Sequence, residues 1–354
     1  YIVDVYRENQ KPEPHLGKFA LFVSFFPALT AGPIDRASDL LPQFSREARF
    51  DPEPIVNGLK LFAWGLFKKV VIADRLAVLV DHVYGTPAEF PGITLLLATL
   101  MFSIQVYADF SGYTDMAIGI GQALGFRLVD NFDRPYSSKT LTEFWRRWHM
   151  SFTSWLRDYI FLPVAYAISR KVKTDRLLNI KNETWAYVSG TMITMLLCGL
   201  WHGSAWTFLL WGGLHGVVLV LSYGTGKIRK KWRKRLVKRA YRKTYATVRV
   251  FLTFSTVSLL WVFFKARSIP DALYIISRIF TPSEWDVSFK TQWLEKNIFL
   301  GEPGETYYII LGALGLMWLV QRLQPHEGMR EMFARRSAPV RWALYIIIVL
   351  AIMN

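Results

Sequence analysis

Apolar runs long enough to cross a membrane alternate along this chain with polar, strongly charged segments. The longest run without Asp, Glu, Lys or Arg covers residues 184–226, which is 43 residues and enough for two passes of about 20 residues each. His202 lies near its middle, where such a hairpin has to turn, and Gly199 and Gly203 flank it. The pattern predicts a helical hairpin with an imidazole deep in the membrane or near its outer face.

Shorter apolar runs predict the other helices. Residues 19–31 are too few to cross, so we expect a re-entrant or broken segment there. Residues 56–73 carry three embedded lysines and suit a tilted or interfacial helix, because long basic side chains can reach back to the membrane surface. Further helices are expected over residues 93–107, 116–126, 248–264 and 307–320.

One helix is predicted from a start signal and an aromatic stripe. Thr140 and Glu143 form a capping-box pattern, and Pro163 is expected to end the segment. Between them, large apolar residues recur at helical spacing, and His149 lies at the edge of that apolar face. A histidine in such a place can be either a packing residue or a functional one.

Charge sets the expected topology. The chain is 52% apolar with a mean hydropathy of +0.21, yet 20% of its residues are charged, which is typical of a polytopic membrane protein. Residues 227–249 hold 12 Lys and Arg and no acid, so we place this segment, together with the basic residues 169–181, in the cytoplasm. Residues 284–305 hold five acids and two lysines and are expected outside. A nucleic-acid-binding role is excluded because the basic residues of this +16 chain cluster between apolar spans.

The expected fold class is therefore an all-α polytopic membrane protein with a single transmembrane domain over residues 1–354. The chain begins with Tyr1, and the apolar run 340–353 stops at its end. We interpret the sequence as a fragment that lacks earlier helices.

Most catalytic templates are absent from the sequence, including a GxSxG elbow, an HExxH zinc motif and a Walker loop. The glycines at 119, 121 and 125 have the wrong spacing for a phosphate loop, and the pair Gly121 and Gly125 suits helix packing better. The single cysteine, Cys198, stands four residues before His202, so a thiol–imidazole pair is one hypothesis and an apolar filler residue is the other.

The two histidines are the main candidates for chemistry. An ionisable side chain at membrane depth is costly and is by default a functional-site hypothesis, although a buried imidazole bonded to a carbonyl explains His202 as simply. An imidazole near neutral pKa suits removal of a proton from a hydroxyl or thiol during acyl transfer. His202 and His149 are therefore the candidate catalytic residues.

Several long motifs resemble the membrane-bound O-acyltransferase (MBOAT) family. They cover residues 26–34, 109–119, 131–136, 144–159 and 199–203, and the resemblance extends from about residue 19 to residue 264. The bacterial branch that contains the alginate O-acetyltransferase membrane subunit is the most similar one, and the D-alanyl transfer protein of teichoic acids is a more distant relative.

This resemblance implies a helical ring with a central tunnel, a catalytic histidine at His202 and a second family histidine at His149. Asp109, Tyr113, Asn131 and Arg146 match motif positions without an assigned role. The implied activity moves an acetyl group from a cytoplasmic donor, expected to be acetyl-CoA, across the inner membrane of a bacterium.

The expected acceptor is an exported polysaccharide or a partner acetyltransferase outside the cell. Polysaccharide-modification proteins and membrane lipids are the expected partners, and no permanent cofactor or metal is expected. Two alternatives stay open: acyl transfer with another donor or acceptor, such as a D-alanyl carrier protein or peptidoglycan, and a conduit or scaffold without chemistry of its own.

Overall fold

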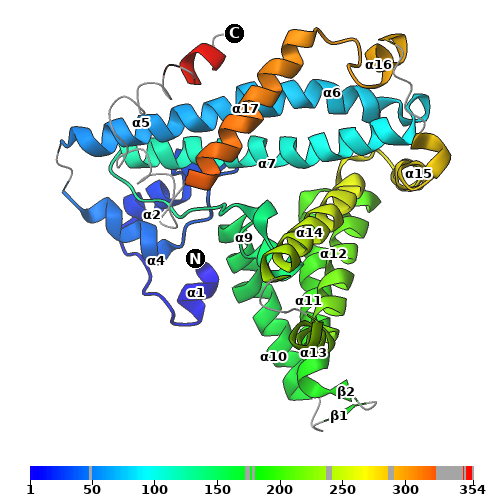
Figure 1. Ribbon diagram of the computed structural model, residues 1–354. Coiled ribbons are helices and arrows are strands. Elements are labelled where there is room, and N and C mark those ends of the chain that lie inside the picture. Colours follow the sequence, from blue (N-terminus) through cyan, green and yellow to red (C-terminus); the bar gives the residue numbers. More distant parts are fainter. Residues whose placement is uncertain are drawn as a thin grey trace. The chain divides into compact units, whose positions relative to one another are not determined.

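The computed structural model describes residues 1–47, 50–171, 176–177, 180–236, 241–285, 291–323, 346 and 348–352. Within these ranges most of the chain is helical (Figure 1). The strands of the described part form a short antiparallel hairpin of β1 (Arg176–Leu177) and β2 (Ile180–Lys181). The expectation of an all-α protein is therefore confirmed, with this small hairpin as an addition.

The helices group into two compact units. The first contains residues 1–77, 104–133 and 303–354, and the second contains residues 78–103 and 134–302. Each unit is described by itself below. The single transmembrane domain and the ring with a central tunnel stay predictions.

The first unit begins with short helices. The run 19–31 is divided between α2 (Leu16–Val23) and α3 (Phe26–Leu29), so a broken segment is confirmed. Its remaining elements before the long helices are α1 (Ile2–Tyr6), α4 (Ala37–Leu40) and the 3-10 helix η1 (Leu41–Ser45). The helix α17 (Gly304–Leu323) also belongs to this unit.

The lysine-bearing run is part of a longer continuous helical path. The helix α5 (Pro52–Phe67) passes into a π-helical turn, η2 (Lys68–Ala73), and then into α6 (Asp74–Gly85). Asp51 caps its start, because the carboxylate accepts a hydrogen bond from the Glu53 backbone N–H at 3.0 Å. The predicted helix over residues 56–73 is thus present, but its ends lie further out.

The structure corrects the prediction of two helical pieces at 93–107 and 116–126. A single helix, α7 (Gly92–Ala123), runs through both. The two acids at and near the gap between the predicted pieces are paired within the first unit. Lys68 Nζ lies 2.8 Å from an Asp115 carboxylate oxygen, and Lys69 Nζ lies 2.6 Å from one of Asp109. These ion pairs allow the helix to continue across its polar stretch.

Glycines bring α5 and α7 into close contact. A Cβ atom on Gly58 would lie 2.4 Å from the Gly119 carbonyl oxygen, and one on Gly65 would lie 2.5 Å from that of Gly112. Any larger residue would push the backbones apart. The packing glycines of α7 are therefore Gly112 and Gly119. The predicted pair was wrong, since Gly125 ends the helix with a φ of +86° and has open space around its Cβ position.

The second unit contains the predicted hairpin. The helices α11 (Asn182–His202) and α12 (Trp206–Gly224) pack along each other, and α14 (Arg242–Lys265) packs against α12 (Figure 1). The second unit also contains three shorter helices, α13 (Gly226–Leu236), α15 (Ile269–Ile279) and α16 (Thr291–Asn297). Its 3-10 helices are η3 (Pro87–Glu89), η4 (Pro135–Ser137) and η7 (Pro282–Trp285).

The predicted aromatic helix is broken in the structure. It consists of α8 (Leu141–Trp145), α9 (Met150–Leu156), the π-helix η5 (Arg157–Phe161) and α10 (Leu162–Lys171). The cap is confirmed, since Thr140 Oγ1 accepts the Glu143 N–H at 3.0 Å. The predicted end at Pro163 is wrong, because the helical path continues from η5 into α10 through this residue. The π-helical turn just before it changes the hydrogen-bond pattern where the proline has no backbone N–H to donate.

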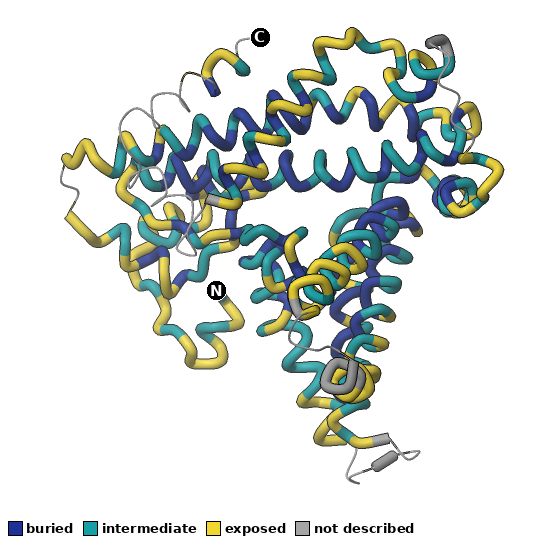
Figure 2. Tube along the Cα trace, viewed as in Figure 1, coloured by how far each residue is buried: buried dark blue, intermediate teal, exposed yellow. Residues whose placement is uncertain are grey.

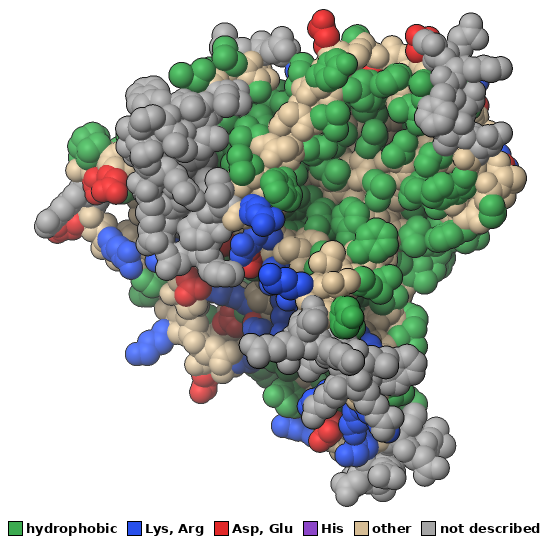
Figure 3. All heavy atoms as spheres, viewed as in Figure 1, with side chains coloured by type: hydrophobic (Ala, Val, Ile, Leu, Met, Phe, Trp, Pro, Cys, Tyr) green, Lys and Arg blue, Asp and Glu red, His purple; other side chains and the backbone are tan. Residues whose placement is uncertain are grey.

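Three helices among the described residues are long and apolar enough to cross a membrane: Gly92–Ala123, Trp206–Gly224 and Lys243–Lys265. Hydrophobic side chains cover broad parts of the surface in view (Figure 3). Buried residues line the faces where α11, α12 and α14 meet (Figure 2). Large apolar side chains that stay exposed, including Leu200, Leu221 and Phe251, suit a lipid-facing surface.

Candidate functional site

His202 is the last residue of α11 and stands at the turn of the hairpin, as predicted. The two helices approach closely just before it. A Cβ atom on Gly199 would lie 2.3 Å from the Phe208 carbonyl oxygen, and one on Gly212 would lie 2.2 Å from that of Met195. Only glycine permits this contact, which holds the end of α11 against α12 and fixes where the imidazole lies.

Aromatic rings surround the His202 imidazole. Its ring centre lies 4.8 Å from that of Trp201, 5.2 Å from Trp211 and 5.1 Å from Phe264. His202 nevertheless keeps intermediate exposure and is therefore not sealed in the core. An imidazole in an apolar wall that remains accessible can meet a substrate while bulk water is limited.

His149 lies at the N-terminal end of α9, where α8 and α9 are separated. Its backbone is left-handed, with φ 44° and ψ 55°, and its residue surface is only 5% exposed. A left-handed non-glycine residue costs on the order of 1–3 kcal/mol, so the surrounding structure must hold it there.

Trp201 connects the two candidate histidines. Its ring centre lies 6.3 Å from that of His149 and 4.8 Å from that of His202. Phe152 stacks on His149 at 4.9 Å and contacts Trp201 at 4.4 Å. The structure thus brings His149 and His202, which are 53 residues apart in sequence, to the same aromatic cluster of one unit.

A third histidine, His215, lies deeper in α12. It is completely buried, and its Nδ1 accepts a hydrogen bond from Trp145 Nε1 at 3.3 Å. The Trp211 indole stands between the two histidines of the hairpin, 5.2 Å from His202 and 4.9 Å from His215. His215 therefore packs behind the site, and its imidazole does not reach His202.

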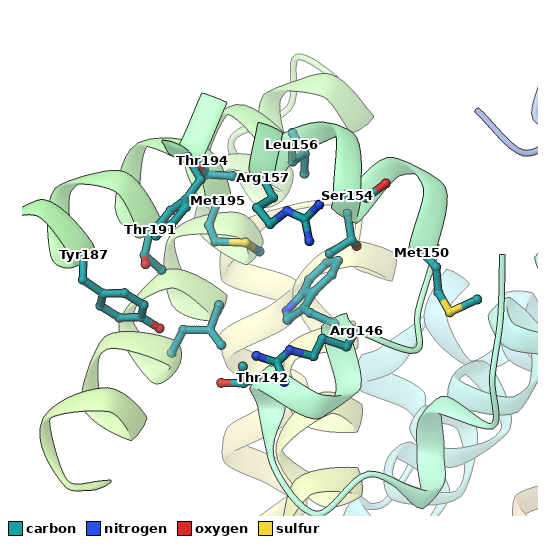
Figure 4. A pocket seen from close by; sticks show the side chains of 14 residues that line it. Thr142, Arg146, Met150, Ser154, Leu156, Arg157, Tyr187, Thr191, Thr194 and Met195 are labelled. Carbon is teal, nitrogen blue, oxygen red and sulfur yellow. The ribbon is translucent and has the colours of Figure 1, made fainter. Parts of the chain in front are cut away.

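A cavity of about 340 Å³ lies beside these residues, within the second unit. Its walls come from α8, α9, η5, α11 and α12, and Figure 4 shows the side chains of Arg146 and Arg157 reaching into it from two sides. Hydroxyl groups of Thr142, Ser154 and Tyr187 also line it. Cavities of this size hold small ligands or part of a larger one.

The two arginines supply positive charge to a mostly apolar space. Arg157 Nε donates to an Asp158 carboxylate oxygen at 2.8 Å, which leaves its terminal nitrogens for other contacts. No ion pair of Arg146 is found in the described part of the chain. An anionic group with an apolar or amide extension would complement such a lining.

The cavity and His202 lie along the same face of α11. Met195 lines the cavity and stands seven residues before His202. Seven residues make about two turns, so the two side chains point in nearly the same direction about 10 Å apart along the helix axis. The cavity and the His202 imidazole are therefore about two helical turns apart on one face of α11.

Sequence reasoning found part of this site. Arg146, a motif position without an assigned role, is a cavity residue, whereas Asp109, Tyr113 and Asn131 belong to the first unit. Arg157, Thr191 and Met195 were missed as lining residues. The seven-residue spacing between Met195 and His202 is the sequence signal that would have identified Met195 as a residue on the same helix face.

Cys198 is fully buried. Among the described residues, no three His, Cys, Asp or Glu side chains group as metal ligands.

Comparisons with known proteins agree with the motifs. The family model of the membrane-bound O-acyltransferases (MBOAT) matches residues 6–263. The chain is 38% identical over 288 residues to a probable alginate O-acetylase AlgI of Azotobacter vinelandii, covering 81% of this chain and 52% of that protein. It is 34% identical to a peptidoglycan O-acetyltransferase of Helicobacter pylori, covering 78% of this chain and 53% of that protein.

A teichoic acid D-alanyltransferase of Streptococcus thermophilus is more distant, at 29% identity, with 73% of this chain and 64% of that protein covered. The chain spans about half the length of the alginate and peptidoglycan relatives.

Proposed function

Because the chain belongs to the membrane-bound O-acyltransferase family, we propose that it carries the acyl-transfer site of a bacterial inner-membrane O-acetyltransferase that crosses the membrane several times. The donor is a cytoplasmic acetyl thioester, acetyl-CoA, and the acceptor is a hydroxyl group on the other side of the membrane. The observation that carries this proposal is the accessible His202 imidazole, on the same helix face as a cavity that displays two arginines.

In the proposed reaction His202 acts as general base. Its neutral imidazole takes the proton of the acceptor hydroxyl while the oxygen forms a bond to the thioester carbonyl carbon. The carbon–sulfur bond then breaks, and the leaving thiolate takes up the proton. In a second route the His202 nitrogen attacks the thioester carbonyl carbon, the carbon–sulfur bond breaks and the thiolate leaves. The acceptor hydroxyl then attacks the acyl-imidazole, the carbon–nitrogen bond breaks, and the hydroxyl proton passes to the thiolate. Both routes require the imidazole to be neutral, which its apolar surroundings favour.

His149 supports the reaction without being the primary base. It is buried and held in a left-handed conformation next to Trp201, the residue that also contacts His202. We assign it the role of orienting the reacting group at the aromatic cluster. Arg146 and Arg157 would hold an anionic part of the donor in the cavity.

The acceptor is an exported polysaccharide or a partner acetyltransferase that passes the acetyl group on. The names of two relatives, an alginate O-acetylase and a peptidoglycan O-acetyltransferase, support a cell-surface glycan as the final acceptor. The name of the more distant relative, a D-alanyltransferase, supports a second candidate function, in which a carrier protein delivers an aminoacyl group to the same histidine. A scaffold without chemistry is the third candidate.

Substitution of His202 separates an enzyme from a scaffold. In cells that express the full protein with its partners, we expect His202→Ala to abolish O-acetylation of the exported polymer while the protein still accumulates in the membrane. His215→Ala is the matched control, because that imidazole lies on the same hairpin behind the Trp211 indole. It should cost far less, and His149→Ala should fall between the two. Normal acetylation with His202→Ala would contradict the enzyme proposal and favour a scaffold without chemistry.

A further inference from the structure

A second, smaller hollow of about 230 Å³ lies in the second unit, away from the histidines. It is formed where α13 begins and where α14 passes the start of α8. Its lining residues are Thr140, Gly226, Arg229, Lys230, Tyr245 and Arg249. Three of these six carry a positive charge and none carries a negative one.

In the described part of the chain, the three cations of this hollow have no acidic partner. Among the residues that the structure describes, no ion pair involves Arg229, Lys230 or Arg249. This differs from Lys68, Lys69, Arg147 and Lys265, each of which lies within 2.8 Å of a carboxylate oxygen. Like charges that share one hollow repel each other, so an anion in the hollow would be stabilising.

Local contacts hold two of the cations in place. The Arg229 side chain donates to the Ser222 carbonyl oxygen and, at 3.0 Å, to the Ser222 hydroxyl, with one terminal nitrogen serving both contacts. Its other N–H groups remain available to a ligand. The guanidinium carbon of Arg249 lies 5.8 Å from the ring centre of Tyr245, one turn earlier on α14. The charged groups are therefore positioned before a ligand arrives, which lowers the entropic cost of binding.

The polar groups that line the hollow provide hydrogen-bond donors suited to a phosphate group. Thr140 Oγ1 accepts the Glu143 N–H at 3.0 Å, so its own O–H remains able to donate. Arginine forks and a lysine ammonium match a multiply charged tetrahedral oxyanion better than a single carboxylate, because each phosphate oxygen can accept from a different donor. The volume is smaller than that of a typical pocket for a whole ligand and suits one phosphate group with its ester substituent.

We propose that this hollow binds a phosphate ester through Arg229, Lys230 and Arg249. The ester is either part of a soluble nucleotide or the headgroup of an anionic lipid, and both present the same charged group. The proposal stands apart from the acyl-transfer function, since the lining contains neither His149 nor His202. In Figure 3, Lys and Arg side chains gather at the end of the second unit that holds α13, where either source would meet the protein.

Binding to the full protein in nanodiscs tests the proposal. One arm titrates adenosine 3′,5′-bisphosphate into phosphatidylcholine nanodiscs and measures its dissociation constant. The other arm counts the phosphatidylglycerol molecules that remain bound in native mass spectrometry after purification from mixed lipid. The variants are Arg229→Gln and Arg249→Gln. The matched control is Lys227→Gln, which makes the same charge change on α13 outside the lining.

Loss of charge-assisted hydrogen bonds to the phosphate should weaken binding about 10- to 100-fold in the affected arm for each lining variant. Weaker nucleotide binding identifies a soluble ester, and loss of bound phosphatidylglycerol identifies a lipid headgroup. Lys227→Gln should bind like the wild type in both arms. Wild-type binding by both lining variants in both arms would overturn the proposal, and so would an equal loss with Lys227→Gln, since that would be an effect of general surface charge.

Discussion

Removing the acid that faces the buried Lys68 should destabilise the first unit strongly. Lys68 is 4% exposed, and its Nζ lies 2.8 Å from an Asp115 carboxylate oxygen and donates to Ser111 Oγ at 2.9 Å. In the Asp115→Asn variant the ammonium would stay buried without its counter-charge. Breaking a buried pair in this way costs about 3–5 kcal/mol in the free energy of unfolding.

Two further variants separate charge from packing. Ser111→Ala removes one hydrogen bond to a charged group and should cost less, about 1.5–3 kcal/mol. The double variant Lys68→Met with Asp115→Asn removes both charges while keeping the shape of the site, so it should recover most of the loss of Asp115→Asn. Unfolding of the purified protein in mixed detergent micelles titrated with SDS measures each free energy. A double variant as unstable as Asp115→Asn alone would refute the reasoning, because it would mean that the unpaired charge is not the cause.

Three other predictions concern the second unit. Cys198→Ser should retain most acetyl transfer, because the thiol is fully buried and packs beside the glycine contact; a loss in a normally inserted variant would revive the thiol–imidazole pair. Residues 227–249 should resist labelling by an impermeant thiol reagent in intact cells when single cysteines are introduced, whereas residues 284–305 should be labelled, and the reverse result would invert the topology. Trp145→Phe removes the hydrogen bond to His215 Nδ1 and should lower the free energy of unfolding by about 1–3 kcal/mol, with an unchanged value contradicting the structural role of His215.

The hairpin and its turn could be predicted from the sequence because a 43-residue stretch without Asp, Glu, Lys or Arg has few other ways to satisfy its backbone in a membrane. The broken segment at 19–31 could be predicted for a similar reason, its length. The continuity of α7 could not, since it depends on lysines that come from a different helix and pair with Asp109 and Asp115.

The break before His149 was also hidden in the sequence. Residues 141–159 keep helical spacing on both sides of it, and the capping signal at Thr140 is consistent with either one helix or two. In the structure Trp145 packs against Trp211 and Trp148 packs against Trp261, which are contacts between distant segments that the local spacing does not reveal. His202 and His149 were identified as candidates by residue type and motif, but the cavity with Arg157 and Met195 depends on how three separate segments meet.

The most direct test of the proposed chemistry measures thiol release from the donor. Acetyl-CoA is supplied to the exposed cytoplasmic face of inverted membrane vesicles that contain the full protein and its acceptor system, and the acceptor-dependent rate of free CoA release is recorded. If His202 is the base, or the transient acyl carrier, His202→Ala should reduce this rate about 10²- to 10⁴-fold at an equal amount of inserted protein, and His215→Ala should stay close to the wild type. A wild-type rate with His202→Ala would contradict the catalytic assignment.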